Sequence, residues 1–438
     1  MNVSSPQKFI VNPSKKLQGT LRVPGDKSIS HRAIMLGALA EGITQVSGFL
    51  EGEDTLATLA AFKTMGVSIE GPYQEQVILQ GVGLQGLQVP NTSLYLGNSG
   101  TSMRLLSGLM AGQAFSVEMY GDASLSRRPM RRVTEPLTTM GAKIETSDKG
   151  TPPLKIYGKQ NLQGINYVMP IASAQVKSCL LLAGLYAKGI TCVTEFAPTR
   201  DHTERMLTGF GYPIKQEGRC ICLQGGGKLQ ARSIDVPTDI SSAAFFMVGA
   251  SIAQGSNMLL EHVGINPTRT GIINILRKMG ANISLHNQRN ISNEPVADIQ
   301  VCASPLHGIE IPKEQVPLAI DEFPVLFIAA ACAKGETILT GARELRMKES
   351  DRIQVMADGL QILGINAIPT PDGMVIRGGQ IQGGVINSHG DHRIAMAFTM
   401  AALRANQTIT IENCANVATS FPNFVDLSEQ VGIEITTL

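Results

Sequence analysis

The sequence predicts an α/β protein made of two similar domains, with three repeats in each. Two recurring segments and the overall composition lead to this prediction. The chain has 438 residues, of which 43% are hydrophobic, so it can form two or three soluble, globular domains with sizeable cores. Internal repeats then decide how the chain is divided.

The first recurring segment has a polar start containing Gly, Ser or Asp, followed by an apolar helix and a small final residue. It occurs six times, as "GDKSISHRAIMLGALAEG", "GNSGTSMRLLSGLMAG", "ASAQVKSCLLLAGLYAKG", "TDISSAAFFMVGASIAQG", "IDEFPVLFIAAACAKG" and "GDHRIAMAFTMAALRAN". These helices are apolar around nearly their whole circumference. That pattern indicates helices buried inside a ring of other elements.

The second recurring segment is an amphipathic helix that stops at a glycine and runs into a strand, as in "FKTMGVSIE". Short β-type runs such as "QVILQG" and "MVIRGG" complete each unit. Six units divide into three plus three, with a hinge near residues 236–240, and an early strand "GTLRV" that could pair with the C-terminal half. The six glycines are Gly66, Gly141, Gly211, Gly280, Gly364 and Gly432.

Charge and hydropathy limit the partners of the protein. There are 37 Lys and Arg against 36 Asp and Glu, which gives a net charge of +1. No global field attracts a polyanion, so we expect no nucleic-acid partner, and any anion must be bound locally. The N-terminus lacks the apolar core of a signal peptide, and no apolar run nears the length needed to span a bilayer. We therefore expect a cytoplasmic protein with no membrane partner.

The cysteines form no paired pattern. Their number is odd, and several lie in apolar runs such as "SCLLLAGL", as reduced core thiols do. The pair Cys220 and Cys222 lies on one face of a strand, but no second pair at ligand spacing follows, so no metal site is predicted. The seven are Cys179, Cys192, Cys220, Cys222, Cys302, Cys332 and Cys414.

Cations near the starts of buried helices point to anionic ligands. Unpaired N–H groups and the positive dipole end favour phosphate or carboxylate there. Lys27 and Arg32 in "GDKSISHR" oppose the dipole, so we interpret them as ligand-binding residues rather than surface charges. "YLGNSGTSMRLL" repeats the pattern with Asn98, Gly100 and Arg104.

Three further segments offer anion-binding groups, each with a structural alternative. "GDASLSRRPMRRV" is a small-anion clamp, a solvated loop or a nucleic-acid patch; the lack of interleaved aromatic residues favours the clamp. "PIASAQVKSC" offers Ser173, Gln175 and Lys177, although these could form a capping box. "PTRDHTERML" adds Arg200.

Candidate acid and base groups lie in the C-terminal half. Asp321 and Glu322 precede the apolar run "FPVLFIAAACA" and either cap that helix or move a proton. In "RMKESDR", Glu349 lies between two cations, Lys348 and Arg352, as in a surface ion-pair lattice or in an acid/base site. In "NSHGDHRIAM", we interpret the arginine as an anion ligand and the histidines as local hydrogen bonders.

Taken together, these segments resemble the 5-enolpyruvylshikimate-3-phosphate synthase family, also called 3-phosphoshikimate 1-carboxyvinyltransferases. "GDKSISHR", "LGNSGTSMRLL", "GDASLSRRPM", "RDHTE", "RMKESDR" and "GDHRIAM" follow the family's order from about residue 17 to the end, and several resemble its class II branch. The resemblance implies an inverted α/β barrel in each domain, built from three βαβαββ units. Their buried helices point at the interdomain cleft.

The resemblance also implies domain limits and a reaction. Domain 1 would comprise residues 1–22 and 239–438, and domain 2 residues 23–238, with the active site between them. The family transfers the enolpyruvyl group of phosphoenolpyruvate to the 5-hydroxyl of shikimate 3-phosphate and releases phosphate. It uses no metal and no organic cofactor. We expect a monomer that acts on these two small molecules in the shikimate pathway and is a target of glyphosate.

Residue roles carried over from the family divide into three groups. The catalytic group is Asp321 as the base for the 5-hydroxyl, Glu349 as the proton donor to the methylene carbon, and Lys27 between both substrates. Shikimate 3-phosphate would be bound by Lys27, Ser28, Arg32, Ser173, Ala174, Gln175, Arg200, Asp321 and Lys348. Phosphoenolpyruvate would be bound by Lys27, Asn98, Gly100, Arg128, Gln175, Arg352 and Arg393.

Two positions depart from the family pattern, and two rival functions stay open. Thr419 occupies a position where many members have lysine, and Ala174 one where others have serine. UDP-N-acetylglucosamine enolpyruvyl transferase shares the fold but carries a cysteine in the loop that here reads "GDASLSRRPMRR". A non-catalytic phosphate-binding repeat protein is the other alternative.

Overall fold

The computed structural model describes residues 7–438 and divides the chain into two compact units. Unit 1 contains the residues through Pro24 together with Pro237–Asn290 and Pro295–Leu438, and unit 2 contains Gly25–Val236 and Ile291–Glu294. The main boundaries lie two residues from those expected at 22/23 and 238/239. The segment Ile291–Glu294 was not expected in unit 2, because a hairpin tip carries none of the repeat markers.

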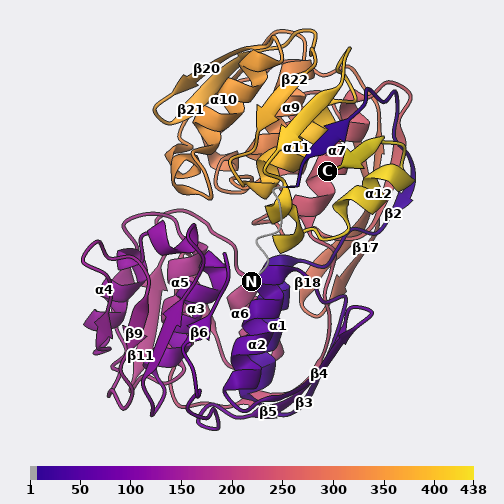
Figure 1. Ribbon diagram of the computed structural model, residues 1–438. Coiled ribbons are helices and arrows are strands. Elements are labelled where there is room, and N and C mark those ends of the chain that lie inside the picture. Colours follow the sequence, from indigo (N-terminus) through magenta and orange to yellow (C-terminus); the bar gives the residue numbers. More distant parts are fainter. Residues whose placement is uncertain (1–6) are drawn as a thin grey trace. The chain divides into compact units, whose positions relative to one another are not determined.

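Six nearly all-apolar helices form at the predicted positions. All 13 residues of α7 are buried, as its sequence "ISSAAFFMVGASI" requires, because the helix has no polar face to turn to solvent. In unit 1, α7, α9 and α11 contact one another and lie side by side in Figure 1. In unit 2, α3 contacts both other buried helices. The six are α1 (Lys27–Leu39), α3 (Gly100–Ala111), α5 (Ala174–Gly184), α7 (Ile240–Ile252), α9 (Phe323–Cys332) and α11 (His392–Ala401).

Six amphipathic helices alternate with the buried ones. Each is followed by its predicted glycine, and all six glycines have positive φ, from +78° at Gly211 to +106° at Gly432. Left-handed backbone ends a helix at low cost only at glycine, so the repeat marker is a helix stop. The helices are α2 (Glu53–Thr64), α4 (Arg131–Thr139), α6 (His202–Gly209), α8 (Gly271–Lys278), α10 (Arg352–Ile362) and α12 (Phe424–Gln430).

Unit 2 contains three mixed sheets, with strand orders β14-β3-β5-β4, β6-β7-β9-β8 and β10-β11-β13-β12; β15 also pairs with β3. The succession β6-α3-β7-α4-β8-β9 is one complete βαβαββ repeat. The strands are β3 (Ala40–Ser47), β4 (Ser68–Tyr73), β5 (Gln76–Val82), β6 (Leu94–Tyr95), β7 (Val117–Tyr120), β8 (Ile144–Glu145), β9 (Leu154–Ile156), β10 (Asn166–Val168), β11 (Ile190–Thr194), β12 (Lys215–Glu217), β13 (Cys220–Gln224), β14 (Leu229–Gln230) and β15 (Ser233–Asp235).

From residue 7 onward, unit 1 also contains three sheets, ordered β22-β23-β1-β24, β17-β18-β16-β2 and β19-β21-β20. The early strand "GTLRV" pairs with the C-terminal half as anticipated, because β2 runs parallel to β16. The strands are β1 (Phe9–Val11), β2 (Gln18–Leu21), β16 (Asn257–Gly264), β17 (Asn282–Ile291), β18 (Glu294–Cys302), β19 (Glu336–Leu339), β20 (Asn366–Thr370), β21 (Gly373–Arg377), β22 (Gly384–Asn387), β23 (Ile409–Glu412) and β24 (Ile435–Thr437).

Each unit has its own hydrophobic core, formed by its buried helices and the inner faces of its sheets. This agrees with the α/β class and with three repeats per domain. In the part of the chain from residue 7 onward, no helix is both long and apolar enough to cross a membrane.

The contact between α3 and α5 depends on a glycine. A Cβ placed on Gly108 would lie 2.1 Å from the carbonyl oxygen of Cys179. We expect Gly108→Ala to lower the free energy of unfolding by about 2–3 kcal/mol, because the two helix backbones must move apart. Urea unfolding would measure this. Gly379→Ala is the matched control, since its added Cβ meets no atom closer than 3.5 Å; equal stability of the two variants would contradict the interpretation.

Candidate active site

The start of α1 places Lys27 next to a carboxylate. Asp26 caps the helix by accepting a hydrogen bond from the Ile29 N–H at 2.9 Å. Lys27, the first residue of the helix, forms an ion pair with Asp54 of α2. The opposition of Lys27 to the helix dipole was interpreted as a sign of ligand binding alone, but the lysine also has a structural partner. Its side chain is still 22% exposed, so it combines a structural partner with access to a ligand.

Arg32 lies one turn further along α1 and is buried. Its guanidinium donates to Thr203 Oγ1 at 2.7 Å, Ser178 Oγ at 2.9 Å and the Ser28 carbonyl at 2.9 Å. None of these acceptors carries a charge. Burial lowers the pKa of Arg32 to about 10, and Glu204 opposes this only in part. A buried cation held by neutral oxygens is favourable when an anion binds beside it.

A second cluster surrounds the start of α3. Ser99 caps this helix, and Gly100 is its first residue. A Cβ placed on Gly100 would lie 3.0 Å from Arg104 Nη1 and 3.2 Å from Arg128 Nη1. The two guanidinium groups therefore flank the helix start, where the backbone N–H groups and the dipole also favour an anion. We refer to Asn98, Gly100, Arg104 and Arg128 as the Gly100 cluster.

Hydrogen bonds fix both arginines of the Gly100 cluster. Arg128 Nη2 donates to Asn98 Oδ1 at 2.6 Å, and Asn98 in turn donates to Asp122 at 2.7 Å. Arg104 Nη1 donates to Gln175 Oε1 at 2.6 Å. Since Gln175 lies at the start of α5, the cluster joins two of the helix starts named from the sequence.

The arginines of the segment "GDASLSRRPMRRV" differ in their partners. Arg128 follows the short 3-10 helix Leu125–Arg127 and reaches the Gly100 cluster. Arg131 instead donates to the carbonyl of Asp148 at 3.3 Å, at an exposed position. The clamp expected from "RRPMRR" thus involves Arg128, and Arg131 contacts a neighbouring turn.

The start of α5 contains a capping serine and a buried lysine. Ser173 caps the helix through the Val176 N–H at 3.3 Å, and Ala174 begins it. Lys177 is only 1% exposed and forms ion pairs with Glu195 at 2.7 Å and Glu204 at 2.6 Å. Its expected role as an anion ligand is therefore wrong, because two carboxylates already compensate its buried charge.

His31 is a buried neutral group in the same unit. Its Nδ1 lies 2.8 Å from Thr58 Oγ1, and its pKa is well below 6.5 because burial, Lys27 and Arg32 all disfavour the charged ring. The folded state thus binds fewer protons than the unfolded state just below pH 6.5. Its contribution to stability is complete above pH 6.5 and is lost as pH falls toward the lowered pKa.

We expect this histidine to make the unfolding of unit 2 pH-dependent. Between pH 6.5 and the lowered pKa, the free energy of unfolding should fall by up to about 1.4 kcal/mol per pH unit. Urea midpoints of wild type and His31→Asn at several pH values would measure the difference. Parallel pH profiles for the two proteins would contradict a neutral buried His31.

In unit 1, Asp321 and Glu349 lie close to Arg352. Asp321 Oδ1 lies 3.2 Å from Lys348 Nζ and 3.5 Å from Arg352 Nη1. Glu349 Oε2 lies 2.7 Å from Arg352 Nη2. Lys348 ends the 3-10 helix Arg343–Met347, and Arg352 begins α10. We refer to Asp321, Lys348, Glu349 and Arg352 as the Arg352 cluster.

Asp391 anchors the Arg352 cluster and was not assigned a role from the sequence. It accepts from Arg352 Nε at 2.8 Å, and both side chains are buried. Burial lowers the pKa of Arg352, but Asp391, Glu349 and Asp321 raise it by more, so the net shift is upward. Burial raises the pKa of Asp391, but the charge of Arg352 lowers it by more, so the net shift is downward. In the sequence, Asp391 lies within the family motif "GDHRIAM", which gave it no role; in the structure it also caps α11.

Arg393 and Glu322 complete the surroundings of this cluster. Arg393 donates to the backbone carbonyl of Asp321 at 3.0 Å and lies 3.9 Å from Glu322. Glu322 is buried, accepts a hydrogen bond from Ser241 and lies 3.9 Å from Arg269. Of the two adjacent acids, Asp321 is therefore the accessible one, and Glu322 holds internal partners.

Two further sequence predictions concern Thr419 and the cysteines. Thr419 is buried and donates to the Asn416 carbonyl at 2.7 Å, so it supplies no cation in place of lysine. Cys192 and Cys222 form a disulfide, which corrects the expectation of unpaired thiols; Cys179 and Cys414 are free and buried. The register of β11 and β13, invisible in the sequence, brings the bonded pair together.

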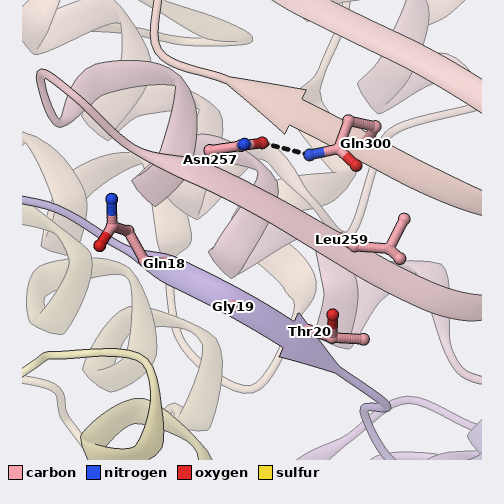
Figure 2. A pocket seen from close by; sticks show the side chains of 6 residues that line it. All are labelled: Gln18, Gly19, Thr20, Asn257, Leu259 and Gln300. Carbon is pink, nitrogen blue, oxygen red and sulfur yellow. Dashed lines mark hydrogen bonds between the residues drawn. The ribbon is translucent and has the colours of Figure 1, made fainter.

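A pocket of about 380 Å³ lies elsewhere on unit 1, on the sheet that contains β2, β16 and β18. Figure 2 shows a hydrogen bond between Asn257 and Gln300 at one side of it. None of its lining side chains is charged, and none is a candidate site residue. The lining residues are Gln18, Gly19, Thr20, Asn257, Leu259 and Gln300.

The two three-repeat α/β units, with cations at the buried helix starts of one and carboxylates beside cations in the other, have the groups that an enzyme acting on small anions requires. The family described as "EPSP synthase (3-phosphoshikimate 1-carboxyvinyltransferase)" matches residues 11–427. The chain belongs to this family. It is therefore a transferase of the shikimate pathway, as its sequence predicted, and its fold is that of the family.

Individual relatives agree along the whole chain. The 3-phosphoshikimate 1-carboxyvinyltransferase of Nitrosococcus oceani is 68% identical over 98% of this chain and 96% of its own length. That of Methylococcus capsulatus is 66% identical over 98% of both. A 2.37 Å structure of EPSP synthase from Acinetobacter baumannii aligns with a TM-score of 0.90 and 59% identity, covering 99% of this chain and all of that one. These comparisons do not support the rival functions.

Proposed function

We propose that site residues from both units take part in transferring the enolpyruvyl group of phosphoenolpyruvate to shikimate 3-phosphate. The observation that carries this proposal is the Arg352 cluster. Two carboxylates there have different cationic neighbours, with Asp321 near Lys348 and Arg352 and Glu349 bonded to Arg352. Transfer to a hydroxyl through an enol ether carbon needs two such proton-transfer groups.

Unit 2 supplies most of the binding groups for shikimate 3-phosphate. Arg32, the buried cation without a charged hydrogen-bond acceptor, compensates the phosphate charge, and Arg200 lies near enough to Arg32 to lower its pKa. Lys27, Ser28, Ser173, Ala174 and Gln175 lie at the starts of α1 and α5. From unit 1, Asp321 and Lys348 would contact the 5-hydroxyl end.

Phosphoenolpyruvate binds at the Gly100 cluster in this proposal. Arg128 and the first turn of α3 compensate its phosphate, Gln175 links the cluster to the other substrate, and Lys27 lies between the two anions. Arg352 and Arg393 of unit 1 bind its remaining charged groups. Several cations are required because two multiply charged molecules must lie within reacting distance.

The reaction follows from these positions. Asp321 accepts the proton of the 5-hydroxyl as its oxygen bonds to C2 of phosphoenolpyruvate, and Glu349 donates a proton to C3, which becomes a methyl group. Glu349 then removes a proton from that methyl group, the double bond forms again, and the bond from C2 to the phosphate oxygen breaks. Phosphate departs with the proton that Asp321 took. Atoms and charge balance across the two steps.

Phosphate release tests the proposal. With phosphoenolpyruvate and shikimate 3-phosphate together, we expect release of one phosphate for each acceptor consumed. Phosphoenolpyruvate alone, or with UDP-N-acetylglucosamine as acceptor, should give none. Absence of release with shikimate 3-phosphate would contradict the proposal, and release with the nucleotide sugar would favour the rival transferase.

Gly100 provides a test of the phosphoenolpyruvate site. The extra methyl group of Gly100→Ala would press on Arg104 and Arg128 at 3.0 and 3.2 Å. We expect the KM for phosphoenolpyruvate to rise by about tenfold or more and inhibition by glyphosate to weaken, while the KM for shikimate 3-phosphate changes little. Steady-state kinetics would measure all three. An unchanged KM for phosphoenolpyruvate would show that Gly100 is not part of the phosphoenolpyruvate-binding site.

The place of action and the oligomeric state belong to the same proposal. Both substrates carry several negative charges and do not cross a bilayer unaided, so the enzyme must act in the compartment that makes them, which we take to be the cytoplasm. A monomer suffices, because each group assigned above comes from one chain. Sedimentation velocity should show a single species of one-chain mass, and a dimer at micromolar concentration would contradict this.

A further inference from the structure

Three cysteines, none of them assigned to the reaction, lie together on the outer face of a sheet in unit 2. On β13, Ile221 and Leu223 point into the core, and the alternate residues Cys220 and Cys222 are only partly buried. On β11, Cys192 has the same orientation between the buried Thr191 and Val193. Side chains alternate along a strand, so the three thiol groups share the solvent side.

The register of the sheet brings the three sulfur atoms close together. Cys192 lies directly opposite Cys222 and is bonded to it, and Cys220 Sγ lies 3.7 Å from Cys222 Sγ. All three sulfur atoms lie within 4.8 Å of one another. Among residues 7–438, this is the one group of three or more His, Cys, Asp or Glu whose ligand atoms are close enough to share an ion.

These distances match the requirements of a thiolate metal site. Sulfur atoms at about 2.3 Å from a tetrahedral Zn²⁺ lie roughly 3.8 Å from one another. The 3.7 Å between Cys220 and Cys222 has that value without any movement of β13. Once the disulfide is reduced, Cys192 needs to move only from bonded distance to a similar separation. Three thiolates also select soft ions over Mg²⁺ or Ca²⁺.

Neighbouring strands leave this face accessible. In the register with β12, Lys215 lies beside Cys222 and Glu217 beside Cys220, and both side chains are largely exposed. On the other side, the exposed Asn166 of β10 lies beside Cys192. The residues directly paired with the three cysteines on these two strands are polar, which favours access of an ion and of a fourth ligand such as water.

We propose that the reduced form of this face binds one thiophilic metal ion, of the class of Zn²⁺ and Cd²⁺, through Cys192, Cys220 and Cys222. Oxidation of Cys192 and Cys222 to the disulfide removes two of the three ligands and closes the site. Reduction by a phosphine restores them: the phosphine becomes its oxide with an oxygen from water, and each sulfur gains a proton. The thiol protons leave when the metal binds.

Cadmium titration tests the site. The protein is reduced with a phosphine, the phosphine is removed without oxygen, and Cd²⁺ is added while the ultraviolet thiolate-to-metal absorption is recorded. We expect a linear rise that ends at one Cd²⁺ per chain. In Cys220→Ser, which keeps the cysteines of the disulfide, the absorption should fall by about one third and the affinity by about 100-fold or more.

Two controls make the result decisive. Cys302→Ser, which removes a partly exposed free thiol of unit 1, should bind Cd²⁺ like wild type. The oxidised wild-type protein should give no absorption. Cys222→Ser provides a second test should Cys220→Ser fold poorly by circular dichroism. No saturable absorption in reduced wild type, or equal binding in Cys220→Ser and wild type, would overturn the proposal. Binding is read without turnover, so this result does not depend on the proposed function.

Discussion

Replacement of Glu349 by glutamine is expected to lower kcat by about 10³-fold, with the KM of each substrate changed less than about tenfold. The amide has nearly the shape of the carboxylate, and its oxygen can still accept the hydrogen bond that Arg352 now donates to Glu349 at 2.7 Å. What it cannot do is carry a proton to the methylene carbon of phosphoenolpyruvate. The loss should therefore appear in the chemical step and leave substrate binding nearly intact.

Rapid-quench kinetics with saturating substrates would measure that step. Glu336→Gln, an exposed residue of β19, is the matched control for loss of one negative charge in the same unit and should retain wild-type kcat. A kcat of Glu349→Gln within about twofold of wild type would show that Glu349 transfers no proton.

Lys27→Met is expected to have the second largest effect, with a fall in kcat/KM of about 100-fold for both substrates. Lys27 is assigned to both anions, so the KM values should rise together. Its ion pair with Asp54 complicates the test, because removal of the lysine leaves a carboxylate that is only 7% exposed without its cation. A purely structural role for Lys27 could mimic the loss of a ligand contact.

A double variant separates the two roles. Asp54→Asn alone keeps Lys27 and should retain most activity. If Lys27 served only to compensate Asp54, Lys27→Met combined with Asp54→Asn would recover wild-type kcat/KM. We expect recovery of thermal stability but not of kcat/KM, because the charge facing the substrates is still missing. Full recovery of activity in the double variant would show that Lys27 does not bind the substrates.

Most of the fold was predicted from the two recurring segments of the sequence. A helix that is apolar around its whole circumference must be buried. The glycine after each amphipathic helix is needed because the backbone there has positive φ, as at Gly66 and Gly432. The hairpin tip at Ile291–Glu294 could not be assigned, since its place in unit 2 depends on contacts such as His202 with Glu294.

Site residues could be predicted where they lie in a segment that recurs along the sequence, such as the start of a buried helix. They were harder to predict where their partners lie on another element of the fold. The roles carried over from the family included Arg352 and Glu349, but none was given to the buried Asp391 that holds Arg352. Lys177 was predicted to be an anion ligand because its own segment contains no carboxylate. The two carboxylates that neutralise it lie on later elements of the chain. Likewise, nothing in the sequence pairs Cys192 with Cys222, which lie opposite each other only once β11 and β13 form a sheet.

The most direct test of the central claim, that carboxylates of unit 1 move protons to and from the substrate carbon, is turnover in heavy water. The methyl group formed when C3 is protonated would carry solvent deuterium, and part of it would remain when a proton is removed again. Mass spectrometry should therefore find deuterium in the enolpyruvyl group of the product. Turnover at a normal rate with no deuterium at C3 would contradict the account.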